Sequence, residues 1–493
     1  MNRFFFVAGK VLAAVFAGIA IAFLVGLAAL KMLPTVIVLV TGLVLAALLG
    51  VVLFLTWTGR GKVKRIIGVA LAVVMIVALS VGSVYVYKTL NALDQISNVK
   101  TETIHIGIYV SGDNTDADSS LAAGYRYGIL QNLDRENTDK VLENFSKTFG
   151  SQPGYQEYEN FPELLEALFN KQVDAIILNQ AYLDLLEEMK GYEDIRTRIR
   201  ELFVEQIEVE IEPAPETQPT NPENISGQEN LLKPFIIYIT GIDAYGSVSV
   251  RSRSDVNILA VVNPQTHQVA LVSTPRDYYV PLSISNGIPD KLTHAGIYGV
   301  NVSMETLEML YDIEIDYYFR VNFSGFTKLI DALGGVTVYS AYAFKTKHYT
   351  YEKGMNTMDG NKALAFCRER YSFSAGDRQR GRNQMAVIQA VINKLISPAL
   401  LTKYTQVLDA ATGTFETNMP MEIIGAITSQ QLKDDGQWNI VTCSADGTGD
   451  NQIPYSMSFS VYVMQPDYKT VERAKTLMQS VYNGEIVDPD EYK

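Results

Sequence analysis

Three long apolar runs precede Lys88, and they constrain the fold more than any other feature of the 493-residue chain. They extend over Phe4–Leu30, Thr35–Trp57 and Ile66–Tyr87. Each has at least the ~20 residues that a helix needs to cross the hydrocarbon core of a bilayer. A cleaved signal peptide is the alternative for the first run, but this run is too long for one and two more follow it. We therefore predict three transmembrane helices within residues 1–99.

The basic residues between these runs predict the orientation of the chain in the membrane. The connection between the second and third runs contains Arg60, Lys62, Lys64 and Arg65. The connection between the first two runs has only Lys31. By the positive-inside rule, the basic connection and the N-terminus are cytoplasmic. An odd number of spans then makes the C-terminal domains of this multi-pass cell-membrane protein extracellular.

A small α/β accessory domain is expected over residues 100–212. Its alternating pattern predicts strands at Thr103–Val110 and Val173–Leu178 and helices at Leu121–Leu133 and Phe161–Asn170. It carries no chemical motif, so we interpret it as a spacer or an interaction module. Residues 213–233 are rich in Pro, Glu, Thr and Asn and predict a solvated linker.

Residues 234–493 predict a second α/β domain with a central mixed sheet flanked by helices. Continuous apolar runs at Phe235–Thr240, Val256–Val262 and Val269–Ser273 are typical of buried strands. A further strand is expected through ALAFCRERY, and helices are expected at Ser303–Leu310, Phe323–Leu333 and Asn383–Ile396.

Polar side chains gather where these apolar strands begin or end. Asp243 follows the first strand, Arg253 and Asp255 come just before the second, and Arg276 and Asp277 follow the third. Each alone fits a turn or a surface salt bridge. Together they favour a ligand site, because sites in open α/β sheets gather beyond the strand ends.

The segment CRERYSFSAGDRQRGRNQ, from Cys367 to Gln384, has five arginines in a chain whose net charge is -13. In the expected strand, Arg368 and Arg370 share a face, with side chains ~7 Å apart, a separation that suits the two phosphates of a pyrophosphate. Arg380 and Gln384 follow at the start of a helix, where anions are favoured. A solvated, ion-paired strand end is the alternative. Nucleic acid is disfavoured, because no recognition-helix pattern accompanies the arginines.

The remaining chemistry-bearing residues argue against zinc and leave the cysteines open. Neither Cys-x-x-Cys nor His-Glu-x-x-His occurs, and carboxylates beside phosphate-binding arginines suit Mg²⁺ instead. Cys367 and Cys443 are too few for a disulfide framework, although they can pair with each other. Cys367 faces away from the arginines in the expected strand and is interpreted as a core thiol.

Five ordered motifs between about Phe235 and Ile396 resemble those of the LytR-CpsA-Psr family. They are RSDVNILAVV, LVSTPRDYYVPL, DKLTHAGIYG, GFTKLIDALGGVTV and MDGNKALAFCRERY…GDRQRGRNQ. The three spans and the additional extracellular domain resemble the streptococcal capsule-assembly branch. The resemblance implies a phosphotransferase that moves a teichoic acid or capsular polysaccharide from undecaprenyl pyrophosphate to peptidoglycan.

The resemblance also implies roles for individual residues. Asp243 and Asp255 match the carboxylates associated with Mg²⁺, Arg276 and Asp277 match a catalytic motif with Asp255, and an aspartate would accept the proton of the attacking hydroxyl. The match to the pyrophosphate clamp covers Arg276, Arg368, Arg370, Arg380 and Gln384, with Arg378 and Arg382 matching less well. Helix Phe323–Leu333 either lines a slot for the prenyl tail or packs in an ordinary core. A non-catalytic polyprenyl-phosphate sensor or envelope regulator is the alternative function.

Overall fold

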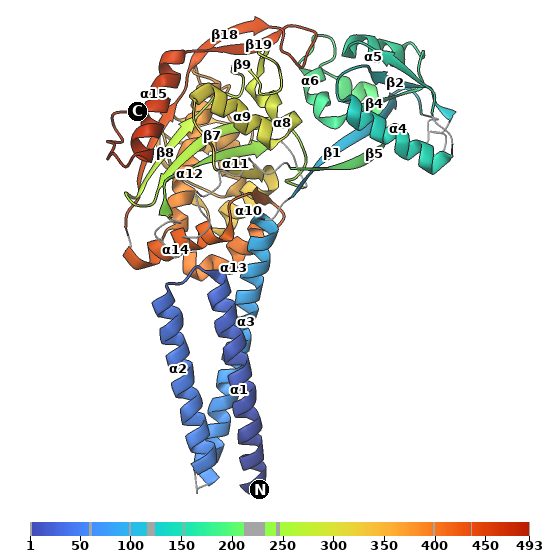
Figure 1. Ribbon diagram of the computed structural model, residues 1–493. Coiled ribbons are helices and arrows are strands. Elements are labelled where there is room, and N and C mark those ends of the chain that lie inside the picture. Colours follow the sequence, from blue (N-terminus) through green and yellow to red (C-terminus); the bar gives the residue numbers. More distant parts are fainter. Residues whose placement is uncertain are drawn as a thin grey trace.

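The computed structural model describes residues 2–58, 62–97, 100–115, 124–150, 153–211, 232–242, 247–397, 400–434 and 436–492. Figure 1 shows three parts: a bundle of long N-terminal helices, an α/β domain directly above it, and a smaller α/β domain beside the larger one. Most of the predicted linker at 213–233, and the candidate metal ligand Asp243, lie outside the described residues.

Three apolar helices form the N-terminal bundle, as the sequence predicts. They are α1 (Asn2–Leu30), α2 (Thr35–Leu53), continued by a π-helical turn η1 (Phe54–Thr58), and α3 (Lys62–Ser97). All three are long and apolar enough to cross a membrane. Small residues let the helices approach closely, since a side chain at Gly26 would begin 2.8 Å from Val86. Helix α3 continues ten residues beyond its predicted end at Tyr87.

The accessory domain is built on a five-stranded sheet in the order β3-β2-β4-β1-β5. Its strands are β1 (Thr101–Ser111), β2 (Tyr127–Leu130), β3 (Tyr155–Tyr158), β4 (Ala175–Asn179) and β5 (Ile199–Glu210). Its helical elements are α4 (Arg135–Phe149), α5 (Phe161–Phe169), η3 (Gln180–Tyr182), α6 (Leu183–Glu187) and α7 (Ile195–Arg198). The predicted strands at 103–110 and 173–178 and the helix at 161–170 are confirmed.

The helix predicted at Leu121–Leu133 is wrong, because its centre forms the interior strand β2. All four residues of β2 are buried, and β2 pairs with both β3 and β4 in parallel. A side chain at Gly128 would begin 2.8 Å from Leu164 of α5, so the strand lies directly under that helix. This tertiary burial overrides the helical pattern, which continues into residues outside the described part.

The larger domain has a six-stranded mixed sheet in the order β16-β11-β6-β7-β8-β17. The strands are β6 (Phe235–Ile242), β7 (Ser254–Asn263), β8 (Gln268–Ser273), β11 (Tyr317–Asn322), β16 (Phe415–Thr417) and β17 (Asn439–Ser444). The β11–β6 and β17–β8 pairs are parallel and the others are antiparallel. The predicted mixed sheet and its apolar strands are confirmed.

Helices cover both faces of this sheet. They are α9 (Val300–Tyr311) and α15 (Tyr468–Tyr482) on one face and α12 (Asp377–Leu395) on the other. Successive side chains of β7 point to opposite faces of the sheet, and the apolar residues of this strand therefore contribute to both faces. Leu259 and Val261 join the core with α9 and α15, whereas Ile258 and Ala260 join the core with Met385 of α12.

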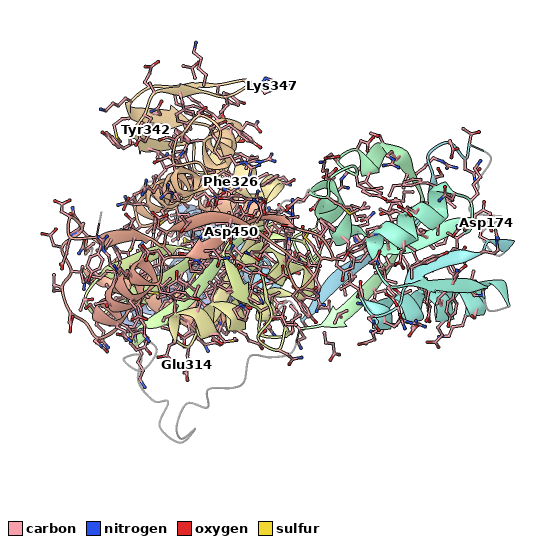
Figure 2. All side chains as sticks on the ribbon, turned by 90° about the horizontal axis from the view of Figure 1, so that it is seen from above. Asp174, Glu314, Phe326, Tyr342, Lys347 and Asp450 are labelled. Atoms are coloured by element: carbon pink, nitrogen blue, oxygen red, sulfur yellow. The ribbon has the colours of Figure 1, made fainter. Side chains whose placement is uncertain are left out.

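A projecting region follows β11 and ends in two small hairpins, at the end of the molecule where Figure 2 labels Tyr342 and Lys347. Its elements are α10 (Phe323–Ala332), β12 (Val336–Ser340), β13 (Phe344–Lys345), β14 (Thr350–Tyr351), β15 (Gly354–Met358) and α11 (Gly360–Arg368). Phe344 stacks on Tyr351 with ring centroids 4.5 Å apart, and both belong to a core with residues of α10, α11 and α12.

The strand predicted through ALAFCRERY is wrong, because residues 360–368 form helix α11. Asp359 caps this helix by accepting a hydrogen bond from the backbone N–H of Lys362 at 2.8 Å. Ala363, Phe366 and Cys367 are buried at helical spacing. The next helix is also longer than predicted, since α12 begins at Asp377 rather than at Asn383.

The larger domain rests directly on the upper ends of the N-terminal helices. Its contacts come from α13 (Leu400–Ala411), α14 (Met421–Asp434) and strand β16. Lys31 Nζ lies 3.0 Å from Glu422 Oε1 of α14. Met421 packs against a small apolar cluster that contains Leu30 and Val86.

A buried charge cluster joins the accessory domain to the larger sheet. Arg320 of β11 is 2% exposed, and its guanidinium lies 2.5 Å from Glu102 of β1 and 2.7 Å from Glu416 of β16. Arg251 reaches Glu102 at 2.9 Å, and the hydroxyl of Tyr318 donates to Glu416 at 2.9 Å. Because each buried charge has an opposite charge beside it, the cluster fixes the start of β1 on the larger domain.

We predict that Arg320→Met lowers the free energy of unfolding by about 3–5 kcal/mol, because it leaves Glu102 and Glu416 buried with one cation fewer. Denaturant unfolding of the detergent-solubilised chain, followed by near-ultraviolet circular dichroism, measures the change. The matched control is Arg126→Met, which removes an exposed pair with Asp174 and is expected to leave stability unchanged. Equal stability of the two variants would contradict a structural role for the cluster.

Candidate functional site

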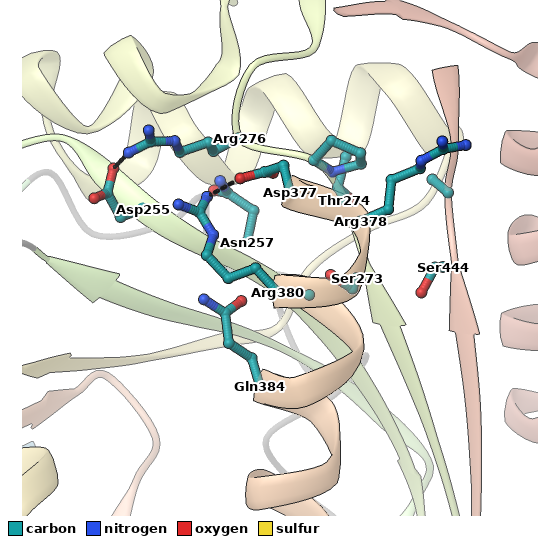
Figure 3. A pocket seen from close by; sticks show the side chains of 13 residues that line it. Asp255, Asn257, Ser273, Thr274, Arg276, Asp377, Arg378, Arg380, Gln384 and Ser444 are labelled. Carbon is teal, nitrogen blue, oxygen red and sulfur yellow. Dashed lines mark hydrogen bonds and ion pairs between the residues drawn. The ribbon is translucent and has the colours of Figure 1, made fainter. Parts of the chain in front are cut away.

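A pocket lies at the edge of the larger sheet where β7 begins and β8 and β17 end. Antiparallel pairing places the start of β7 beside the end of β8, and parallel pairing places Ser444 of β17 opposite Ser273 of β8. The first turns of α12 close this edge, and a side chain at Gly381 would begin 2.5 Å from Ser273 Oγ. The charged and amide side chains that line the pocket, shown in Figure 3, are Asp255, Asn257, Arg276, Asp377, Arg378, Arg380 and Gln384.

Asp255 and Arg276 form an ion pair at one side of the pocket. Arg276 Nη1 donates to Asp255 Oδ1 at 2.8 Å, and Thr293 Oγ1 donates to the same oxygen at 3.2 Å. Burial alone would raise the pKa of Asp255, but the guanidiniums of Arg276, Arg253 and Arg380 outweigh burial and lower this pKa to about 2. Asp255 is therefore ionised and is a weak proton acceptor.

Asp377 and Arg380 form a second pair, in the first turn of α12. Arg380 Nη2 lies 2.6 Å from Asp377 Oδ1. Burial raises the pKa of Asp377 and the charge of Asp277 adds to this rise, against the opposing effect of Arg380. Burial also lowers the pKa of Arg380. No role for Asp377 was predicted from the sequence, although its place at the start of an arginine-rich helix was a signal.

Asp277 lies behind the pocket and supports Arg276. Its Oδ1 is 2.8 Å from Lys291 Nζ, and its Oδ2 is 3.7 Å from Arg276 Nε. Burial would raise the pKa of Asp277, but Lys291 and Arg276 outweigh burial and lower it. Lys291 ends strand β10 (Pro289–Lys291), which pairs with β9 (Tyr279–Pro281). The sequence reasoning quoted this lysine in a motif without assigning it to the site.

Arg368 and Arg370 do not line the pocket with the other predicted clamp residues. They stand at and beyond the end of helix α11, so the shared strand face expected for them is wrong. The Arg368 guanidinium stacks over the Phe323 ring at 4.4 Å, and Arg370 Nη2 donates to the Tyr371 hydroxyl at 2.6 Å. Arg370 is still near enough for its charge to lower the pKa of Asp377.

Gln384 lines the pocket and also holds α11 in place. Its Nε2 donates to the carbonyl oxygen of Cys367 at 3.3 Å, and Asn383 makes the same contact with Phe366. Cys367 is a buried free thiol whose pKa is raised by burial, and Cys443 is also buried and free. The two cysteines are therefore not paired.

Few side chains in the described residues lie close enough together to bind a metal ion. In the described ranges, His, Cys, Asp and Glu side chains form no group of three or more that could hold a metal. Strand β6 ends at Ile242, which pairs with Ser254 next to Asp255. Mg²⁺ commonly takes one or two carboxylates and completes its shell with water and substrate phosphates, and Asp255 is a pocket carboxylate of the type that this ion uses.

Sequence comparison assigns the family. A family model described as the LytR_cpsA_psr family matches residues 204–480, more than half of the chain. The chain belongs to this family.

Similar curated proteins carry the name polyisoprenyl-teichoic acid–peptidoglycan teichoic acid transferase TagU. The one from Oceanobacillus iheyensis is 37% identical over 205 residues, which span 40% of this chain and 63% of that protein. The one from Halalkalibacterium halodurans is 32% identical over 234 residues, which span 47% of this chain and 75% of that protein. The crystal structure of B. subtilis TagU aligns with a TM-score of 0.41 and 30% identity over 52% of this chain and all of that one.

Proposed function

We propose that this protein transfers a glycopolymer, such as teichoic acid or capsular polysaccharide, from an undecaprenyl-pyrophosphate carrier to peptidoglycan. The observation that carries the proposal is the pocket itself, in which Arg276 and Arg380 converge beside Asp255 and Asp377. Guanidiniums bind phosphate oxygens in a bidentate manner, and buried ones do so at high strength. The names of the TagU relatives support the choice of polymer donor and peptidoglycan acceptor.

In this proposal, Arg276 and Arg380 bind the pyrophosphate and neutralise the charge that develops on its leaving phosphate. Arg370 adds positive charge from the end of α11. The phosphate oxygens would replace the carboxylates that hold these arginines in the free protein. We assign Mg²⁺ to Asp255 together with Asp243, where the ion would supply further charge neutralisation at the phosphates.

We assign the proton acceptor to Asp377 rather than to Asp255 or Asp277. The pKa values of Asp255 and Asp277 are lowered, whereas that of Asp377 is raised. A general base works best when its pKa lies close to the working pH. Asp377 also lines the pocket, so it can take the proton of an acceptor hydroxyl that attacks the phosphate.

The function is tested with the full chain in detergent or nanodiscs, a synthetic prenyl-pyrophosphate-linked oligosaccharide and peptidoglycan oligomers. We expect a joined product that carries the bridging phosphate, released prenyl phosphate in equal amount, and loss of both on addition of EDTA with recovery by Mg²⁺. Donor binding without any joined product would favour the sensor instead.

Two variants separate binding from chemistry in this assay. Arg380→Ala removes a charge-assisted contact worth roughly 1.5–3 kcal/mol, so donor affinity should fall about 10- to 100-fold. Asp377→Asn should leave donor affinity within about threefold and reduce turnover about 100-fold or more, because it removes the base. Donor affinity is measured by calorimetry and turnover by product formation.

The control for Arg380→Ala is Arg382→Ala, since Arg382 lies two residues further along α12 and does not line the pocket. Its donor affinity should match that of the parent protein. If Asp377→Asn keeps the parental turnover, Asp377 is not the proton acceptor.

We further propose that the pocket is extracellular, on the strength of the three apolar helices and the basic connection before α3. Both native cysteines are buried, so a single introduced cysteine reports on topology. Lys353→Cys, at an exposed position of the projecting region, should react with a membrane-impermeant thiol reagent on intact protoplasts. Lys64→Cys should react only after lysis, and the opposite pattern would invert the orientation.

A further inference from the structure

Two carboxylates of the accessory domain reach the residues behind the pocket. Arg253 precedes β7 by one residue, and its side chain is 13% exposed. Its Nη1 lies 2.9 Å from Glu188 Oε1, and its Nε lies 3.3 Å from Asp184 Oδ2. Arg253 therefore points toward the accessory domain although it stands only two residues before Asp255.

The other carboxylate oxygen of Glu188 is connected to Asp277 through Lys291. Glu188 Oε2 is 2.8 Å from Lys291 Nζ, and the same ammonium is 2.8 Å from Asp277 Oδ1. Asp277 in turn approaches Arg276, which lines the pocket. One accessory-domain carboxylate thus holds two cations, each of which acts on an acid next to Arg276.

The helix that carries Asp184 and leads into Glu188 is fixed in position by an apolar interface. Leu183 and Leu186 of α6 are buried in a core that also contains Ile297 of α8 (Ala295–Tyr298). The same core includes Val461 and Val463 of β19 (Val461–Pro466), which pairs with β18 (Gly447–Gln452). Because this core is shared by the two domains, α6 cannot leave the larger domain without exposing it to water.

We propose that Glu188 is a positioning residue for the transfer reaction, which holds Arg253 and Lys291 so that Asp255 and Asp277 keep the positions in which they pair with Arg276. This inference rests on the proposed function. It gives the accessory domain a part in the chemistry of a site that lies wholly in the other domain. The contacts support it, because Glu188 lies 2.9 Å from Arg253 and 2.8 Å from Lys291.

Removal of the Glu188 carboxylate should lower turnover but strengthen phosphate binding. Without its negative charge, Arg253 keeps only Asp184 and Lys291 keeps only Asp277. Both cations can then shift toward the acids beside Arg276, so the acids leave their working positions and turnover falls. The same loss leaves the pocket with one more unit of positive charge nearby, so a phosphate anion binds more tightly. A loosened fold would instead weaken binding and turnover together.

The test compares Glu188→Gln with Glu187→Gln in the full chain. Both variants lose one carboxylate from the same turn, but Glu187 pairs with Arg196 inside the accessory domain, 2.9 Å away. For Glu188→Gln we expect turnover to fall about tenfold and the dissociation constant for inorganic pyrophosphate, measured by calorimetry, to fall about threefold. Glu187→Gln should match the parent protein in both. Glu188→Asp, which keeps the charge on a shorter side chain, should recover part of the turnover and the parental pyrophosphate affinity.

Each outcome decides between the two proposals. Equal turnover in Glu188→Gln and Glu187→Gln, or a joint loss of turnover and pyrophosphate affinity, overturns the role of Glu188. If the parent protein transfers no polymer, only the proposed function is overturned. The pyrophosphate affinities of Glu188→Gln and Glu187→Gln can still be compared in that case. If Glu188→Gln does not fold, the test rests on Glu188→Asp. Parental turnover of this variant at unchanged stability would contradict a positioning role for Glu188, because that role depends on the length of the side chain.

Discussion

The buried guanidinium of Arg320 is the constraint on which the arrangement of the domains depends. A cation so deeply buried needs opposite charge on both sides, and it finds Glu416 in its own sheet and Glu102 in the accessory domain. Glu102 stands five positions after the end of α3, so the pairing fixes the chain where it leaves the helical bundle. The contact of Glu188 with Arg253 joins the same two domains at a second place, beyond helix α6.

The sequence predicts those parts of the site that follow from local pattern. Asp255, Arg276 and Asp277 adjoin continuous apolar strands, and unpaired charges on such strands are most easily accommodated at the strand ends. Arg380 and Gln384 were expected near a helix start, and they lie in the first two turns of α12, which begins earlier than predicted. The mixed sheet and the three apolar helices are likewise visible in the sequence, because long runs without charge permit few alternatives.

The errors arise where two local patterns compete or where only tertiary contacts decide. The run ALAFCRERY alternates like a strand, but Asp359 as a helix cap and burial at Ala363, Phe366 and Cys367 favour a helix. Placing Arg368 and Arg370 on one strand face followed from that error. Lys291 and Glu188 are distant in sequence from the arginine-rich segment. No periodicity in the sequence reveals that this lysine, at the end of β10, meets an accessory-domain carboxylate behind Arg276.

The attachment of the larger domain to the helical bundle bears on how the proposed carrier-linked donor would reach the pocket. Lys31 holds Glu422 at the upper end of α1, while α3 leads within a few residues to the Glu102–Arg320 pair. The larger domain thus contacts the bundle at separate points near α1 and α3, and these contacts restrict its rotation. The proposed prenyl carrier is anchored in the same bilayer as these helices, so the height of its pyrophosphate is set by the lipid headgroups. Under the proposed function, the contacts of α13 and α14 with the helical bundle would hold the pocket at a constant height above the bilayer, and the polymer rather than the protein would extend into the cell wall.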